Sequence, residues 1–375
     1  MKHLSFRLVI DAARRLVWSL LLFFANPVCA ADFAQGVTAY KRADYPTALA
    51  VFTQAANLND ARAQYALGLM YAHGEGVSAD VAQALEWYSR SAESGYARAQ
   101  YELGLLYLKG LGTPRDDARA REWFARAAEG GNADAAARYR QFAEAGDVEA
   151  QYNLGLMTLR GNNASRDPKR AAEWFKRAAF RGHLGAMFSY ARLFETGRGV
   201  SRSFRDAADW YDRAADQGEP RANFNLAGLY RLGLGVDRDL VKAEHYYVQA
   251  AKHGYVQAAF TLGLLYDQGE GWTQDPGQAV IWYEKAARLG NAEAAINLGY
   301  LYAQGRGLTK DLVSAYAWYY AAGQLNQPLA SGNLAALESA LSRDAVMSGQ
   351  ADGLALLEAI RARMDGSDQA AGKPQ

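Results

Sequence analysis

Two glycines separated by one residue follow an apolar stretch in the sequence YAHGEGVSAD, at Gly74 and Gly76. A glycine-rich turn can cradle a phosphate with backbone N–H groups, so this element is first considered as a nucleotide site. That fingerprint needs a preceding strand, a third glycine and a βαβ unit, and residues 71–80 show none of these. The Gly-x-Gly element also occurs six times in the chain, and six nucleotide sites in one protein are implausible.

The histidines offer no better route to catalysis. His3 lies in the N-terminal segment, and the other four are His73, His183, His245 and His253, none of which forms a metal-ligand spacing. The sequence has no HExxH, GxSxG or P-loop motif, and no serine is followed three places later by lysine. We therefore expect no enzyme activity, no cofactor and no metal.

The glycines belong to a longer repeat. Equivalent residues are 36 apart where the spacing is undisturbed, as from Trp87 to Trp123 and from Trp174 to Trp210. The repeat reads A-x-A-x-Y-x-L-G-x-x-Y-x-x-G-x-G-V-x-x-D-x-x-x-A-x-x-W-Y-x-x-A-A-x-x-G. Seven copies begin near Ala61, Ala97, Val148, His183, Glu219, Tyr255 and Asn291. A repeat of this length indicates stacked supersecondary units rather than one globular core.

Each position of the repeat has a physical role. Ala63, Leu67 and Tyr71 are four residues apart, so they share one helix face. Gly74 ends that helix, where a positive φ favours glycine. Asp80 is expected to begin the second helix as its N-cap. The same position is occupied in later copies by Asp116, Asp167, Ser203, Asp239, Asp275 and Asp311.

Over residues 61–323 this pattern resembles the Sel-one-like repeat (SLR) family, relatives of the tetratricopeptide repeat with a longer inter-helix loop. In the first copy the matching residues are Ala63, Leu67, Gly68, Tyr71, Gly74, Gly76, Asp80, Ala84, Trp87, Tyr88, Ala92 and Gly95. The resemblance implies an all-α fold, a right-handed superhelical α-solenoid of antiparallel helix pairs, in a bacterial exported protein.

The chain is expected to divide into seven segments. These are residues 1–30, a signal peptide; 31–60, a tetratricopeptide-like capping helix pair; 61–131, two repeats; 132–146, an insertion; 147–323, five repeats; 324–364, a C-terminal helical cap; and 365–375, a disordered tail. The 15-residue insertion reads as one extra helix, or as a repeat that lost its loop and second helix. It is either a functional hinge or a neutral deletion scar.

The first thirty residues have the pattern of a secretory signal. A basic segment precedes the apolar run LVWSLLLFFA at Leu16–Ala25, and small residues precede a cleavage site after Ala30. We expect export to the periplasm, with secretion or outer-membrane association as alternatives and an uncleaved anchor as the alternative to cleavage. The run is too short to span a bilayer, and no later segment is long enough. Cys29 is the only cysteine, so the mature chain has no disulfide.

The charge balance argues against a nucleic-acid partner. Removing residues 1–30 takes away four basic residues and one acidic residue, which changes the net charge from +1 to −2. No overall basic field then attracts nucleic acid.

By analogy with tetratricopeptide repeats, the resemblance implies a partner-binding groove lined by the first helix of each pair. The candidate residues are Arg62, Tyr65, His73, Arg98, Tyr101, Lys109, Arg160, Arg192, Arg231, Asp267 and Tyr300. This set is basic toward the N-terminus and middle and mixed later, although a solvated helix face with incidental charge would look the same.

We expect a monomeric, non-catalytic scaffold or adaptor of the cell envelope that binds another protein or peptide. The alternative is a module that binds peptidoglycan or an anionic polysaccharide. A weak β-lactam-interacting enzyme is the third reading, but the SLR proteins described that way are rich in cysteine, and this mature chain has none.

A substitution tests the predicted packing. Gly104 is the glycine at which the second helix should approach the first, so Gly104→Val is expected to overpack that contact. The free energy of unfolding should fall by about 1–3 kcal/mol or more. Thermal melting of the variant measures this, and a wild-type melting temperature would contradict the assignment.

Overall fold

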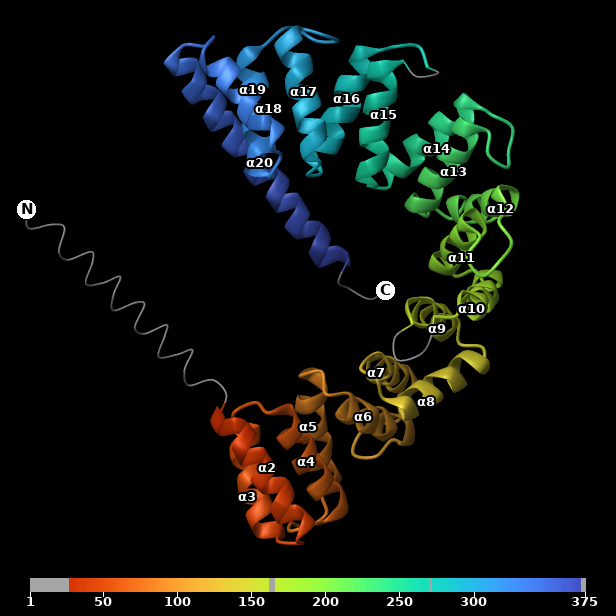
Figure 1. Ribbon diagram of the computed structural model, residues 1–375, viewed down its shortest axis with the longest axis vertical. Coiled ribbons are helices and arrows are strands. Elements are labelled where there is room, and N and C mark those ends of the chain that lie inside the picture. Colours follow the sequence, from red (N-terminus) through yellow and green to blue (C-terminus); the bar gives the residue numbers. More distant parts are fainter. Residues whose placement is uncertain (1–26, 162–165, 270–271, 372–375) are drawn as a thin grey trace, which may run out of the picture. The chain divides into compact units, whose positions relative to one another are not determined.

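The computed structural model describes residues 27–161, 166–269 and 272–371, and its regular secondary structure there is entirely helical (Figure 1). The helices are, in chain order, α2 (Pro27–Lys41), α3 (Tyr45–Asn57), α4 (Ala61–His73), α5 (Val81–Glu93), α6 (Ala97–Lys109), α7 (Asp117–Glu129), α8 (Ala133–Glu144), α9 (Val148–Arg160), α10 (Pro168–Phe180), α11 (Leu184–Thr196), α12 (Phe204–Ala215), α13 (Pro220–Leu232), α14 (Leu240–Lys252), α15 (Val256–Gln268), α16 (Pro276–Arg288), α17 (Ala292–Gln304), α18 (Leu312–Gln324), α19 (Leu329–Glu338) and α20 (Arg343–Ala371).

These helices form two compact units that divide within α10. The N-terminal unit ends at Trp174 and the C-terminal unit begins at Phe175. In each unit, consecutive helices pack as pairs, for example α4 with α5 and α13 with α14 (Figure 1). This repetition confirms the predicted all-α solenoid of helix pairs.

The loop that contains Gly74 and Gly76 joins the two helices of a pair, α4 and α5. Gly74 has the left-handed conformation, with φ of 72°, and its N–H donates to the carbonyl of Met70. The carboxylate of Asp80 then accepts from the backbone N–H groups of Ala82 and Gln83. The predicted roles of a C-terminal glycine and an aspartate N-cap are confirmed, so the Gly-x-Gly element is a connector between two helices.

A glycine lets the two helices of a pair approach closely. Gly104 on α6 lies under the ring of Phe124 on α7, which is fully buried. A Cβ atom added at Gly104 would lie 2.8 Å from Cε1 of Phe124. Gly68 on α4 meets Tyr88 on α5 in the same way.

Successive pairs are joined by a buried side-chain amide. Nε2 of Gln64 on α4 donates to the carbonyl of Ala56 on α3, at 3.3 Å. Gln100 on α6 makes the equivalent bond to Ala92 on α5, at 3.1 Å. Gln151 and Asn223 make the same bond to Ala143 and Ala215, so in these four copies a buried amide ties the first helix to the end of the preceding helix.

Helix α8 occupies the predicted insertion and combines features of both helices of a pair. It begins as a first helix does, with the side chain of Asn132 capping the N–H of Ala135. Its buried residues, however, match a second helix: Tyr139 and Ala143 have the spacing of Tyr88 and Ala92. Nε2 of Gln151 also donates to the carbonyl of Ala143, as to a preceding second helix. The interior of α8 therefore differs from a first helix that lost its loop and partner, because its packing residues are those of a second helix.

The C-terminal cap is built from α19 and α20, which both pack on α18. Leu357 and Ile360 of α20 are buried. The backbone of α20 continues to Ala371, whereas the tail at 365–375 was predicted to be disordered. Residues 365–371 contain no proline to stop the helix, since Pro374 is the first after α20 begins.

The predicted signal peptide lies mostly outside the described residues. The described chain starts with α2 at Pro27, upstream of the predicted cleavage site after Ala30. Among the helices described, none is both long enough and apolar enough to cross a membrane.

The glycine contacts lead to a matched pair of substitutions. Gly228 lies within α13, and a Cβ there would come no closer than 3.8 Å, to the hydroxyl oxygen of Tyr247. Gly228→Ala should therefore raise the free energy of unfolding by about 0.5–1 kcal/mol, because alanine loses less entropy than glycine in a helix. Gly104→Ala should lower it, because the ring of Phe124 must move. Chemical denaturation measures the free energy of unfolding of both variants. If it changed in the same direction in both, the contact between Gly104 and the ring of Phe124 would not be what excludes a side chain.

Candidate binding pocket on the first helices

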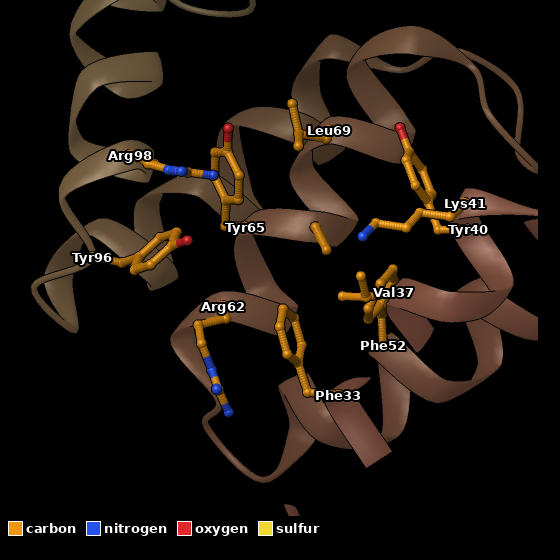
Figure 2. Close-up of a pocket in the computed structure, with 11 residues that line it drawn as sticks. Phe33, Val37, Tyr40, Lys41, Phe52, Arg62, Tyr65, Leu69, Tyr96 and Arg98 are labelled. Carbon is orange, nitrogen blue, oxygen red and sulfur yellow. The ribbon is translucent and has the colours of Figure 1, made fainter. Parts of the chain in front are cut away.

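Three of the predicted partner-binding residues meet at one pocket in the N-terminal unit. Arg62 and Tyr65 lie on α4, and Arg98 lies on α6 (Figure 2). The cavity has a volume of about 250 Å³. Its lining residues come from α2, α3, α4 and the start of α6: Phe33, Val37, Tyr40, Lys41, Phe52, Arg62, Tyr65, Ala66, Leu69, Tyr96 and Arg98.

Aromatic rings form much of the wall. The ring of Phe33 lies 5.6 Å from that of Phe52, between centroids. Tyr65 packs against Tyr96 at 5.3 Å and against the buried Tyr88 at 5.8 Å. These contacts hold the rings in place without filling the cavity, so the wall presents a preformed apolar surface.

The charged residues of the pocket are all cations. They are Lys41, Arg62 and Arg98, and no carboxylate is among the lining residues. In Figure 2, the side chain of Lys41 reaches toward the middle of the pocket and Arg98 lies beside Tyr65. Apolar rings with cations at the edge form a site that favours an anion attached to an apolar group.

The Arg62 guanidinium is held by two contacts of its own chain. It pairs with the carboxylate of Asp60 at 2.6 Å and lies over the ring of Phe33, 4.5 Å from the centroid. Burial raises the pKa of Asp60, but the hydrogen bonds and charge of Arg62 outweigh burial and leave that pKa below its usual value. The main role of Arg62 is therefore structural, as part of the pocket wall.

Arg98 has no such carboxylate. The N-cap of α6 is Tyr96, which makes no side-chain capping hydrogen bond, whereas the N-cap of α4 is Asp60. Within the described part of the chain, no ion pair or hydrogen bond engages the Arg98 side chain, which is exposed. Arg98, like Lys41, is thus a cation of the pocket whose hydrogen-bonding capacity is not used by the described residues.

Two other predicted residues, His73 and Lys109, lie at the C-terminal ends of α4 and α6 and are exposed. Both affect the pKa of Glu102, which is half-buried on α6. Burial raises the pKa of Glu102, and the charges of His73 and Lys109 oppose that rise. His73 and Lys109 therefore lie near an acid of their own chain. Tyr101 is half-buried and packs on Phe124, at 5.7 Å between ring centroids.

The remaining predicted residues lie elsewhere and do not form one site with the pocket. Arg160 is exposed at the end of α9 in the N-terminal unit. In the C-terminal unit, Arg192 is exposed on α11, Arg231 is half-buried on α13 and Tyr300 is exposed on α17. Asp267 on α15 is half-buried and pairs with Arg306 at 3.0 Å.

In the C-terminal unit, acidic side chains lie at positions equivalent to that of Arg231, a predicted partner-binding residue. Oε2 of Glu195 on α11 accepts from the hydroxyl of Tyr211 at 2.6 Å, and Nδ2 of Asn225 donates to the same hydroxyl at 2.8 Å. Glu195, Arg231 and Asp267 are 36 residues apart, so acid, base and acid alternate along successive first helices. This unit therefore offers mixed charge where the pocket offers cations.

Sequence reasoning missed the half of the pocket that comes from the capping pair. Phe33, Val37 and Lys41 on α2 and Phe52 on α3 lie outside the repeat, so the periodic alignment gave them no groove position. A signal was nevertheless present. Phe33 lies three residues before Gly36, as Tyr65 lies three residues before Gly68, which places Phe33 in the aromatic position of a first helix.

The described residues contain no group of three or more His, Cys, Asp or Glu side chains arranged to hold a metal ion. The pocket can therefore bind a ligand through its apolar wall and its cations. Arg62 is held in place by its own chain, whereas Arg98 is available to a ligand.

A tyrosine of the pocket makes stability depend on alkaline pH. The Tyr40 hydroxyl donates to Glu75, and this bond, together with burial, raises the pKa of Tyr40 to about 12. Folding therefore holds the Tyr40 proton more tightly than the unfolded chain, whose value is 10.0. The contribution is fully present below pH 10.0 and is lost as the pH rises toward 12.

Tyr40→Phe removes this contribution. The stability difference between wild type and variant, measured by urea denaturation, should be constant up to about pH 10 and shrink toward pH 12. A difference that stays constant across that range would show that the Tyr40–Glu75 bond does not form.

Comparisons with known proteins agree with this architecture. The family model of the Sel1 repeat matches seven segments: residues 61–96, 97–132, 148–183, 185–219, 220–255, 256–291 and 292–327. Comparison with curated proteins gives no match.

Solved structures give the same result. The chain is similar to a Sel1 repeat protein from Oxalobacter formigenes, with 32% sequence identity over 82% of this chain and 86% of that chain and a TM-score of 0.50. It also resembles a protective antigen of uropathogenic Escherichia coli strains that displays an SLR fold, with 27% identity over 92% of this chain and 87% of that chain and a TM-score of 0.38. The repeats extend over most of residues 61–327, and the chain belongs to the Sel1 repeat family.

Proposed function

We propose that this protein is a non-catalytic adaptor of the bacterial cell envelope that binds another protein through its first helices. Sel1 repeat proteins are generally protein-interaction scaffolds and are typically not enzymes. The signal-like sequence at residues 1–30 supports action outside the cytoplasm.

The pocket is the observation that carries the proposal. Protein interfaces are enriched in aromatic residues and arginine, and their strongest contacts lie in preformed, well-packed pockets. Here Tyr65 and Tyr96 are ordered by ring contacts, and Arg98 stands beside them without an ion pair among the described residues. Such a site can receive a partner's side chain with little loss of its own side-chain entropy.

One observation favours a second candidate, the binding of peptidoglycan or another anionic polysaccharide. The pocket carries cations and no carboxylate among its lining residues, and a polymer with regularly spaced acid groups would also be attracted. The apolar wall weighs against it, since a sugar ring needs more hydrogen-bonding partners than this wall provides.

Photo-crosslinking in intact cells separates the two candidates. A photoreactive amino acid at Arg98, and separately at Arg192, should form adducts with one dominant protein, identified by mass spectrometry. The matched control is Arg126, an exposed arginine of α7 that lies over the ring of Trp123. Recovery of the adducts in the periplasmic fraction is expected from the proposed location.

Two outcomes would contradict the adaptor proposal. Adducts with glycan only, from Arg98 or Arg192, would favour polysaccharide binding. Protein adducts as abundant at Arg126 as at Arg98 and Arg192 would show no preference for the first helices.

A further inference from the structure

We infer that the pocket binds an acidic peptide segment of another protein, with one large apolar side chain in the cavity and a neighbouring carboxylate on Arg98. This inference rests on the proposed function and adds the chemistry of the partner.

The cavity fits one side chain rather than a whole ligand. Its volume of about 250 Å³ lies below the roughly 300–1,000 Å³ of pockets that enclose drug-sized molecules. Phe33, Val37 and Leu69 supply its apolar wall. A phenylalanine or leucine side chain would bury its surface there, while the backbone that carries it remains outside.

The available cation stands next to this apolar site. Arg62 is already neutralised by Asp60, as Arg221 is by Glu219 in the C-terminal unit at 2.7 Å. At the start of α6, Tyr96 replaces that acid, so Arg98 lacks the intramolecular carboxylate. A carboxylate of the partner would take the place that Asp60 takes beside Arg62, and a fork of N–H donors suits it geometrically.

The chain contains a natural comparison for this site. In the C-terminal unit, Phe224 packs on Tyr247 at 5.4 Å and on Tyr255 at 5.2 Å, as Tyr65 packs on Tyr88 and Tyr96. Tyr255 is also an N-cap without a side-chain capping bond. The residue two places on is Gln257, where α6 has Arg98. The aromatic trio therefore serves packing in both units, and the cation is what distinguishes the pocket.

Charge and wall together favour a peptide over a sugar. The hydroxyl of Tyr40 already donates to Glu75, so it is not available to donate to a saccharide. An acidic peptide needs only a cation for its carboxylate and a cavity for one side chain. Lys41, whose side chain reaches into the pocket, adds attraction for a second acidic residue.

Fluorescence anisotropy with the full chain tests the inference. The probe is a fluorescein-labelled acidic heptapeptide with phenylalanine at its centre and glutamate on both sides. Two matched peptides replace the phenylalanine by serine or the glutamates by lysines. The first should bind, with an affinity that falls as salt rises, and the two others should bind at least about tenfold more weakly.

Variants locate the binding. Arg98→Gln gives the pocket the residue found at Gln257 and should weaken binding of the acidic peptide about tenfold or more. The control Arg126→Gln removes the same charge from α7 and should leave binding unchanged. Equal effects of the two substitutions would overturn the inference, because bulk charge rather than the pocket would then be responsible.

A second pair of variants keeps the test independent of folding. Tyr96→Asp and Tyr96→Asn both remove the ring that packs on Tyr65, and both can cap α6, so the two variants should have similar stability. Only Tyr96→Asp supplies a carboxylate to Arg98. It should therefore weaken peptide binding several-fold relative to Tyr96→Asn. Equal binding by the two variants would show that the Arg98 guanidinium does not receive the peptide.

The outcome is distinguishable from failure of the adaptor proposal. If the acidic peptide does not bind but Arg192 still crosslinks to one protein, the pocket inference is wrong and the adaptor function stands. If labelled polygalacturonate binds, Arg98→Gln weakens that binding and the peptide does not bind, the site recognises an anionic glycan and both proposals fall.

Discussion

The contact on which the rest of the structure depends is an aromatic ring resting on a glycine. In several pairs the ring of the second helix lies on the backbone of the first, as Tyr88 lies on Gly68 and Tyr319 on Gly299. A side chain at Gly68 or Gly104 would press on the ring, because a Cβ atom there would lie within 3 Å of it and protein interiors are densely packed. At the equivalent positions of α11 and α13 the chain has Ala191 and Ala227, and these helices still pair with α12 and α14. The ring is fixed by the glycine, and the helix spacing is fixed by the ring.

On the outer faces of the second helices, arginine side chains cover tryptophan rings. Trp87, Trp123 and Trp210 are each covered by an arginine three residues later, at 4.7–4.8 Å from the ring. The arginine shields apolar surface from water and keeps its charge in solvent. Helix packing, capping and shielding thus use residues that recur in most copies. The predicted partner-binding arginines lie on the first helices, at positions that these three roles do not use.

The repeated features of the helix pairs could be predicted from the sequence, because each structural role favours one residue type. A positive φ after α4 favours glycine, and an N-cap before α5 favours aspartate, so Gly74 and Asp80 could be placed by chemistry alone. The pocket could be predicted only in part. Arg62 and Arg98 fall at aligned positions, but Phe33 lies on a capping helix without the repeat, and its nearness to Arg62 is a tertiary fact. Likewise, the sequence around Tyr96 does not show that Arg98 lacks a carboxylate. That difference becomes clear only from the structure, where Asp60 pairs with Arg62.

Helix α8 has a consequence for the history of such arrays. It starts with the cap of a first helix at Asn132 and continues with the buried Tyr139 and Ala143 of a second helix. The cap of a first helix and the buried positions of a second helix therefore occur in phase within one helix. Since both kinds of helix bury small residues at the same four-residue interval, recombination inside a helix can shorten an array and still yield a chain that packs. Arrays of this kind can change length by fractions of a repeat, and a lineage can reset the distance between two recognition surfaces in one genetic event.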